Sequence, residues 1–124
     1  MFNKNNSCFI IAELSANHGQ NIDLAKKSVI AAKDCGADAI KLQTFTADTI
    51  TIDSNLYDFI IKGDTLWDGR TLYDIYKEGS LPWEWHQELF DLANKIGLVC
   101  FSSPFDFTAV DFLEELDCPI YKIA

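Results

Sequence analysis

The sequence has few basic residues for its size. Its 124 residues include 10 lysines and arginines against 19 aspartates and glutamates, which gives a formal net charge of −9. This scarcity argues against binding to nucleic acid or to anionic membrane surfaces, because both recruit basic patches. An acidic protein that binds an anion must do so with a few lysines in particular places.

The sequence also lacks paired cysteines. Its four cysteines are widely spaced, and no C-x-x-C motif occurs, so zinc binding and dithiol redox chemistry have little support. We predict that they are small buried hydrophobic residues in a reducing compartment. They are Cys8, Cys35, Cys100 and Cys118.

Signals for export and for membrane insertion are missing as well. Met1–Ser7 is polar, and no basic-then-apolar segment precedes the first apolar run. No apolar run approaches the length of a membrane span. We therefore expect a cytoplasmic protein.

What the sequence does contain is short apolar runs that alternate with helical patterns, in a chain of which 48% is hydrophobic. This βαβ repetition predicts a parallel sheet with flanking helices. The run Cys8–Ala12 is typical of a strand buried on both faces. We predict strands at Cys8–Ala12, Ala39–Thr44, Leu98–Phe101 and Pro119–Ala124, helices at Asn21–Cys35, Pro82–Ile96 and Phe107–Leu116, and a helical turn around Thr71–Lys77.

Two α/β architectures fit this order, an open doubly wound sheet and a (β/α)₈ TIM barrel. No G-x-G-x-x-G follows the first predicted strand, so a dinucleotide-binding sheet loses support. A closed barrel needs about 250 residues and eight strands. If the fold is a barrel, the four predicted strands are its first half.

Polar residues lie at or near the carboxyl end of each predicted strand, where parallel α/β folds assemble their sites. The candidate residues are Glu13, Asn17 and His18 after the first strand, Lys41 and Gln43 on the second, Ser102 and Ser103 after the third, and Lys122 on the fourth.

Lys41 and Lys122 occupy matching places on two strands. Burying two ammonium groups near each other is unfavourable unless a negative charge lies between them, so the pair predicts a shared anion. A phosphate or carboxylate of a small phosphorylated metabolite suits this site, with serine hydroxyls around its oxygens. In the alternative, each lysine extends to solvent at a strand end, and Glu13 is a structural partner of one of them.

The remaining candidates have structural explanations too. Ser102 and Ser103 could cap the next turn. A lone histidine such as His18 is more often a hydrogen-bonded structural residue than a ligand. We expect His86 on a helix surface, and Trp83, Trp85 and Phe90 on a face packed against the sheet.

Four motifs resemble a known family in their order and spacing. They are IIAELSANHG, GADAIKLQTF, FSSPFD and PIYKIA, and they are similar to the amino-terminal half of the sialic acid synthase family. The region Ile60–Phe90 resembles the branch of that family that forms pseudaminic acid.

The resemblance implies a TIM-barrel synthase followed by an antifreeze-like domain, in a domain-swapped homodimer. Residues 1–124 would be the amino-terminal half of the barrel, with the other half and the second domain absent. The implied reaction condenses phosphoenolpyruvate with a 2,4-diacetamido-trideoxy-altrose to give a nine-carbon ulosonic acid and phosphate. The product decorates bacterial surface structures such as flagella.

The resemblance further implies a divalent metal, Mn²⁺ or Mg²⁺, with its ligands in the missing half. The chain alone is therefore expected to be inactive. Related synthases that form N-acetylneuraminate or legionaminate remain alternatives, as does a non-catalytic anion-binding α/β module.

The matched motifs assign roles residue by residue. Lys41, Ser103 and Lys122 match residues that hold phosphoenolpyruvate, and Glu13 matches a carboxylate that faces the sugar, which makes it the catalytic acid–base candidate. Gln43 lies near the metal region by analogy. Asn17, His18 and Ser102 receive no defined role, and Gln20 stands where the family has a glycine.

Overall fold

The structure, a computed structural model, describes residues 8–124, so the expectation for Met1–Ser7 lies outside the described residues. A three-stranded parallel sheet runs through its centre in the order β1-β2-β3. The strands are β1 (Ile11–Glu13), β2 (Ala39–Thr44) and β3 (Val99–Pro104). The predicted parallel α/β class is confirmed.

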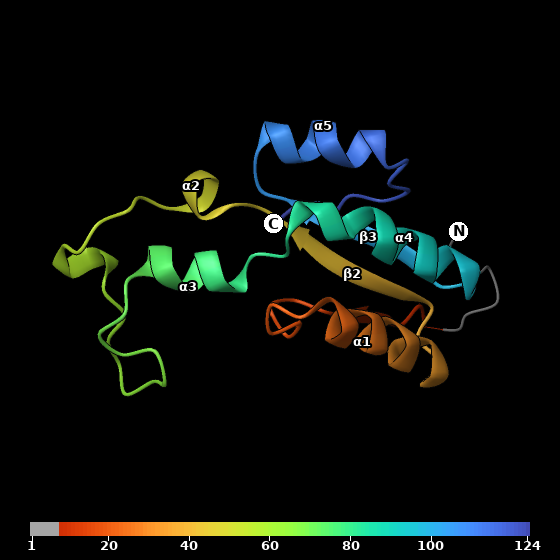
Figure 1. Cartoon of the computed structure of the whole chain (residues 1–124), viewed down its shortest axis with the longest axis horizontal. Helices are drawn as coiled ribbons and strands as arrows, with labels where there is room; N and C mark the ends of the chain where they lie inside the picture. The colour runs from red at the N-terminus through yellow and green to blue at the C-terminus, as the bar shows by residue number, and fades with distance from the viewer. Residues whose placement is uncertain (1–7) are drawn as a thin grey trace.

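Three helices, α1 (Ile22–Asp34), α4 (His86–Lys95) and α5 (Phe107–Glu115), pack against one face of this sheet (Figure 1). Alternate strand residues such as Ile40 and Leu42 join one apolar core with them. A doubly wound sheet would carry helices on both faces, whereas a barrel carries them only outside. The one-sided packing therefore favours the barrel. Helical members of the core are Ala25, Val29, Leu89, Phe90, Ala93 and Leu113.

Side-chain caps explain where two of these helices begin. The Asn21 side chain accepts a hydrogen bond from the backbone N–H of Leu24 at the start of α1. Asp106 does the same for the N–H of Ala109 at the start of α5. Each cap satisfies an N–H that has no partner within its helix.

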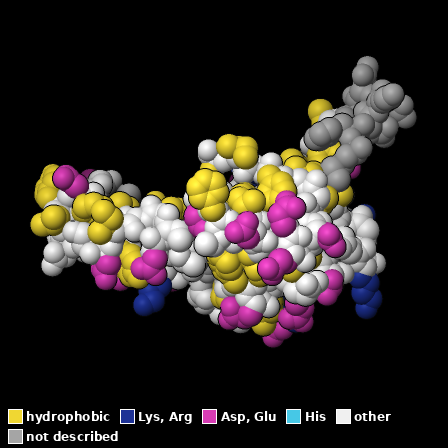
Figure 2. Space-filling model, turned by 90° about the horizontal axis from the view of Figure 1, so that it is seen from above, with side chains coloured by type: hydrophobic (Ala, Val, Ile, Leu, Met, Phe, Trp, Pro, Cys, Tyr) yellow, Lys and Arg dark blue, Asp and Glu magenta, His cyan; other side chains and the backbone are white. Residues whose placement is uncertain are grey.

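The segment 45–80 extends away from the sheet and its helices (Figure 1). It contains α2 (Ala47–Ile50), a 3₁₀ turn at Tyr57–Phe59 and α3 (Leu72–Gly79). Hydrophobic side chains gather at its outer end (Figure 2). Leu66 in this segment is 97% exposed. Within residues 8–124, no helix has the length and apolar character needed to cross a membrane.

Two strand predictions need correction. The predicted strand Pro119–Ala124 is reduced to a single parallel bridge between Tyr121 and Ser102. Burial of the first strand on both faces is also wrong. Ile11 is half-exposed, because β1 is an edge strand and helices cover only one sheet face.

The predicted helix Pro82–Ile96 is divided into a 3₁₀ turn at Trp83–Trp85 and α4. Trp85 and Phe90 pack in the core as predicted, whereas Trp83 stacks on Phe112 of α5. His86 was predicted on the surface, and this is wrong: its side chain is fully buried.

The prediction that the four cysteines are buried is correct for only some of them. Cys100 is buried and Cys118 is half-buried, but Cys8 and Cys35 are exposed. Cys35 is exposed because it caps the end of α1, where the chain turns at the surface. All four thiols are unpaired.

Candidate functional site

The uncovered face of the sheet carries most of the predicted site residues. Glu13 pairs with Lys41 in register, and Gln43 pairs with Ser103. Residues paired across parallel strands project to the same face, and positions two apart along a strand share it. Glu13, Lys41, Gln43 and Ser103 therefore share the face that no helix within residues 8–124 covers.

Lys41 is only 5% exposed although it lies on this face. Its Nζ lies 3.3 Å from Oε1 of Glu13, whose side chain is more than half exposed. An ammonium group has three donors, and a buried one is stable only with negative partners. The Glu13 carboxylate supplies one such partner. In the ligand-free protein Glu13 is therefore a structural partner of Lys41, as the alternative explanation predicted.

Lys41 and Lys122 line one hollow on the uncovered face, with a volume of about 220 Å³. The Lys122 side chain is exposed, and its backbone N–H donates to the carbonyl of Ser102, which holds the segment beside β3. Two lysine residues from distant parts of the chain thus border one space. The complete lining is Phe9, Ile11, Glu13, Lys41, Phe101, Ile120, Tyr121 and Lys122.

Ser103 lies on the same sheet face, next to Gln43, and is 1% exposed. Its Oγ is buried and has no hydrogen-bond partner among residues 8–124. A buried hydroxyl without a partner costs about 1–3 kcal/mol, which a ligand oxygen could recover. Gln43 is half-buried beside it.

Ser102 does not join this group, because neighbouring strand residues point to opposite faces. Its Oγ lies 2.7 Å from Oγ1 of Thr44, and Thr44 Oγ1 lies 2.9 Å from Nε2 of His86. The residue patterns assigned Thr44 no role beyond a polar residue at the end of its strand and placed His86 on a helix surface, so this contact was not predicted. The spacing of His86, Leu89, Phe90 and Ala93 was the available signal, because it places the histidine on the apolar stripe of α4.

His18 is buried away from the hollow and tethers two segments. Its Nε2 donates to the carbonyl of Gly79 at 3.3 Å, and its Nδ1 accepts from the backbone N–H of Gln20 at 3.2 Å. Burial lowers the pKa of His18 below its usual 6.5. The structural explanation of His18 thus accounts for its contacts.

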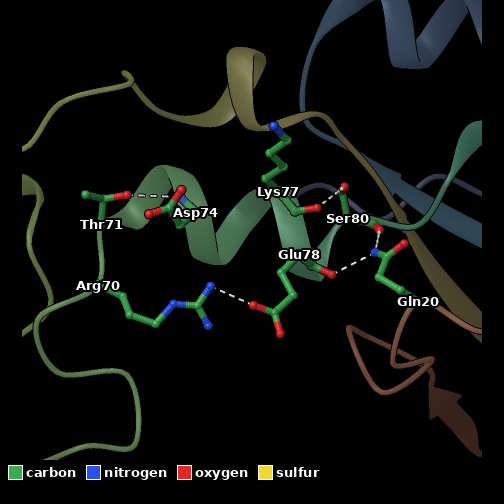
Figure 3. Close-up of polar contacts among 7 residues, drawn as sticks. All are labelled: Gln20, Arg70, Thr71, Asp74, Lys77, Glu78 and Ser80. Atoms are coloured by element: carbon green, nitrogen blue, oxygen red, sulfur yellow. Dashed lines mark hydrogen bonds and ion pairs between the residues drawn. The ribbon is translucent and has the colours of Figure 1, made fainter.

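Gln20 holds the same two segments together, namely the β1–α1 loop and the end of α3. It has a φ of +52°, in the left-handed region that favours glycine. Its side-chain amide donates to the carbonyls of Glu78 and Ser80, each at 2.7 Å, and so holds the end of α3 (Figure 3). These two hydrogen bonds offset the unfavourable backbone conformation.

A larger cavity of about 500 Å³ lies between the β1–α1 loop and the segment 45–80. Asn17 lines it, and its amide also donates to the carbonyl of Leu14. Trp67, half-exposed, contributes an indole ring. Arg70 forms an ion pair at 2.6 Å with Glu78 in the wall (Figure 3). The other lining residues are Ala16, Gly19, Gln20, Ile75 and Gly79.

The described residues do not by themselves fit a metal ion. Residues 8–124 contain no group of three or more histidine, cysteine, aspartate or glutamate side chains that could ligate one. Divalent metals in enzymes ordinarily take several such ligands. We assign no step to a metal on these residues.

The chain is similar in sequence to curated synthases. It is 52% identical over 123 residues to pseudaminic acid synthase of Campylobacter jejuni and 55% identical over 115 residues to that of Helicobacter pylori. It is 40% identical to N,N′-diacetyllegionaminic acid synthase of Legionella pneumophila. These matches cover 99%, 93% and 94% of this chain but 36%, 34% and 33% of the relatives, so the chain spans about a third of their length.

Solved structures share the fold. An N-acetylneuraminic acid synthetase from Leptospira borgpetersenii superposes with a TM-score of 0.78 at 24% identity, over 99% of this chain and 40% of that one. A spore coat polysaccharide biosynthesis protein from Bacillus subtilis gives 0.68 at 28% identity, over 97% of this chain and 30% of that one. The expected barrel-type arrangement is confirmed.

The family profile described as "NeuB family" matches residues 28–124, most of the chain. The predicted resemblance to sialic acid synthases, and within them to the pseudaminic branch, is confirmed by this match and by the higher identity to the pseudaminic acid synthases. The chain belongs to the NeuB family.

Proposed function

We propose that this chain supplies the phosphoenolpyruvate-binding strands of a pseudaminic acid synthase. The observation that carries the proposal is the hollow bordered by both Lys41 and Lys122. Phosphoenolpyruvate carries a phosphate and a carboxylate, and two ammonium groups can each hold one of them. Identity of 52% and 55% to pseudaminic acid synthases supports the choice of reaction.

In this proposal Lys41, Lys122 and Ser103 position the substrate. The buried Ser103 hydroxyl donates to a ligand oxygen, and the lysines align the methylene carbon with the sugar aldehyde. That carbon forms the new bond to the aldehyde carbon. Water then adds at C2, and phosphate leaves as its bond to C2 breaks.

Glu13 acts as the acid–base group. In the ligand-free protein its carboxylate pairs with Lys41. When the anion binds the Lys41 ammonium group in place of the Glu13 carboxylate, that carboxylate can contact the sugar instead. The water that adds at C2 releases a proton and the aldehyde oxygen gains one, and a carboxylate at this position can take up the first and supply the second.

We place the sugar in the larger cavity, whose wall begins three residues after Glu13. The Trp67 indole suits the apolar face of a sugar ring, and the Asn17 amide suits acetamido groups. Identification of the sugar as a 2,4-diacetamido-trideoxy-altrose follows the relatives' names and is part of the proposal.

We further propose that catalysis needs the remaining barrel strands and the antifreeze-like domain, in a homodimer. The required Mn²⁺ or Mg²⁺ would then be held mainly by residues outside 8–124, because residues 8–124 contain no cluster of three acidic, histidine or cysteine ligands. The enzyme would act in the cytoplasm and supply an ulosonic acid for flagellin glycosylation.

Calorimetric titration of this chain with phosphoenolpyruvate tests the anion site. We expect binding that weakens about tenfold or more in Lys41→Met and is unchanged in Lys95→Met, an exposed lysine on α4. A phosphate-release assay with the sugar and Mn²⁺ should show no turnover by the chain alone. Absence of binding by the wild-type chain contradicts the proposal.

The alternatives give different results in the same assays. Equal affinity for phosphoenolpyruvate and inorganic phosphate, with no turnover in a longer protein, identifies a non-catalytic anion module. Turnover of a longer protein with N-acetylmannosamine or with the legionaminate precursor identifies one of the related synthases.

A further inference from the structure

A buried chain of hydrogen bonds lies on the helix side of the sheet, at the strand residues next to Gln43 and Ser103. It joins Ser102 on β3, Thr44 on β2 and His86 at the start of α4. All three side chains are fully buried. The face that holds Ser103 and Gln43 is thus backed, on the helix side of the sheet, by polar contacts between the ends of the two strands.

The direction of each hydrogen bond follows from the Pro82 carbonyl, the acceptor next to His86 at one end of the series. Nδ1 of His86 lies 3.2 Å from the carbonyl of Pro82, which can only accept. Nδ1 therefore carries the proton, and Nε2 of the neutral ring accepts from Thr44. Since the Thr44 hydroxyl proton is used in this way, its oxygen accepts from Ser102.

Neutral His86 is required for this pattern, because a charged imidazolium would donate from both nitrogens. Burial, in the company of Phe112 packed against its ring, lowers the pKa of His86 to about 4. Glu84 is the charged side chain that acts on it in the opposite direction. The ring is neutral at ordinary pH.

The chain of hydrogen bonds determines the strand geometry on the opposite face. Ser102 and Ser103 are neighbours on β3, and Gln43 and Thr44 are neighbours on β2. Each anchored residue is adjacent to one that faces the site. Ser103 Oγ has no hydrogen-bond partner of its own among residues 8–124, so its position depends on the backbone that Ser102 and Thr44 hold.

We propose that His86 is a positioning residue that acts through Thr44 and Ser102 to hold the Ser103 hydroxyl in place for the anion. The proposal rests on the proposed function, because it assumes that this face binds phosphoenolpyruvate. It assigns a role in ligand affinity to a side chain that does not touch the ligand.

Two conservative variants separate positioning from simple stabilisation. His86→Gln retains an oxygen near the place of Nε2 that can accept from Thr44. His86→Asn retains an N–H near the place of Nδ1 that can donate to Pro82 but loses the link to Thr44. Both variants remove the buried ring, so both should lower the unfolding temperature. Only His86→Asn should lower anion affinity strongly.

A matched control is Val29→Ala, a fully buried truncation in the core on α1 that also destabilises the fold. Thr44→Val serves as a second test, since it removes the central hydroxyl while the His86–Pro82 contact stays. We expect about tenfold weaker phosphoenolpyruvate binding in His86→Asn and Thr44→Val, and less than about threefold in His86→Gln and Val29→Ala.

NMR titration of the ¹³C,¹⁵N-labelled chain with phosphoenolpyruvate measures both the tautomer of His86 and the affinity for the anion. The ring signals are assigned with His18→Gln, since the sequence has two histidines. We expect the Nδ1–H tautomer for His86 and the affinity order above. Wild-type chain that does not bind contradicts the proposed function and the inference with it. Binding that falls equally in His86→Gln, His86→Asn and Val29→Ala, or an Nε2–H tautomer at His86, overturns the inference alone.

Discussion

The ammonium group of Lys41 lies 3.3 Å from a carboxylate oxygen of Glu13, its register partner across the β1–β2 pair. Lys41 is almost fully buried, and Glu13 is more than half exposed. At the proposed site, an incoming anion would therefore compete with Glu13 for the same ammonium group. This competition links anion binding to the release of the proposed acid–base group.

Glu13→Gln should therefore separate binding from chemistry. Loss of the competing negative charge should leave phosphoenolpyruvate affinity unchanged or raise it several-fold. In a catalytically complete protein, loss of the acid–base group should lower kcat by about 10²–10⁴-fold. Calorimetry and a phosphate-release assay measure the two effects. A large loss of affinity with full turnover contradicts both assigned roles of Glu13.

Lys41→Met should remove the binding function without unfolding the protein. Removal of one partner of an ion pair is strongly destabilising only when it leaves the other charge buried and unpaired. The Glu13 carboxylate that remains is exposed and can be hydrated. We expect an unchanged or higher unfolding temperature, and no further rise on addition of phosphoenolpyruvate. A variant that unfolds well below the wild-type temperature contradicts this view of Lys41.

Stability should decrease as the pH falls from 7 to 5. The unfolded chain protonates His86 near 6.5, whereas the folded chain resists until about 4. The unfolded state thus binds more protons in this range, and the free energy of unfolding falls with pH, by up to about 3 kcal/mol from His86 at pH 4. The lowered pKa of His18 acts in the same direction.

Urea unfolding at pH 7, 6 and 5 measures this dependence before most carboxylates titrate. His86→Gln should remove the larger part of it, and His18→Gln a smaller part. A free energy of unfolding that is constant over this range shows that the buried histidines do not behave as described.

Gln20 offers a test of the junction between the β1–α1 loop and α3. Gln20→Ala loses both hydrogen bonds to the α3 end and keeps a side chain at positive φ, which costs about 1–2 kcal/mol. Gln20→Gly loses the same hydrogen bonds but relieves the backbone. We expect faster amide hydrogen exchange in α3 for both variants, and a larger loss of stability for Gln20→Ala. Equal stability of the two variants contradicts the role of the backbone conformation.

The succession of strands and helices along the chain could be predicted from residue patterns. Ala39–Thr44 was predicted with the observed bounds because its apolar run is interrupted by a lysine and ends in polar residues. Their matching places on two strands predicted that Lys41 and Lys122 would border one space, and both line the same hollow. Local pattern and strand geometry were sufficient for these features.

Contacts between distant segments could not be predicted in the same way. Burial of His86 depends on Thr44, 42 residues earlier, and on the packing of Phe112. The contacts of Gln20 depend on the end of α3, about 60 residues later. The exposed Ile11 reflects a sheet face without helices, which no property of β1 itself reveals.

The account depends most on one anion being held by both lysines. A double-mutant cycle measures this directly, with phosphoenolpyruvate affinity determined for the wild-type chain, Lys41→Met, Lys122→Met and the double variant. We predict that each single change weakens binding about tenfold or more and that the two effects are not additive, while Lys95→Met binds as wild type. Wild-type affinity in Lys122→Met would contradict the account.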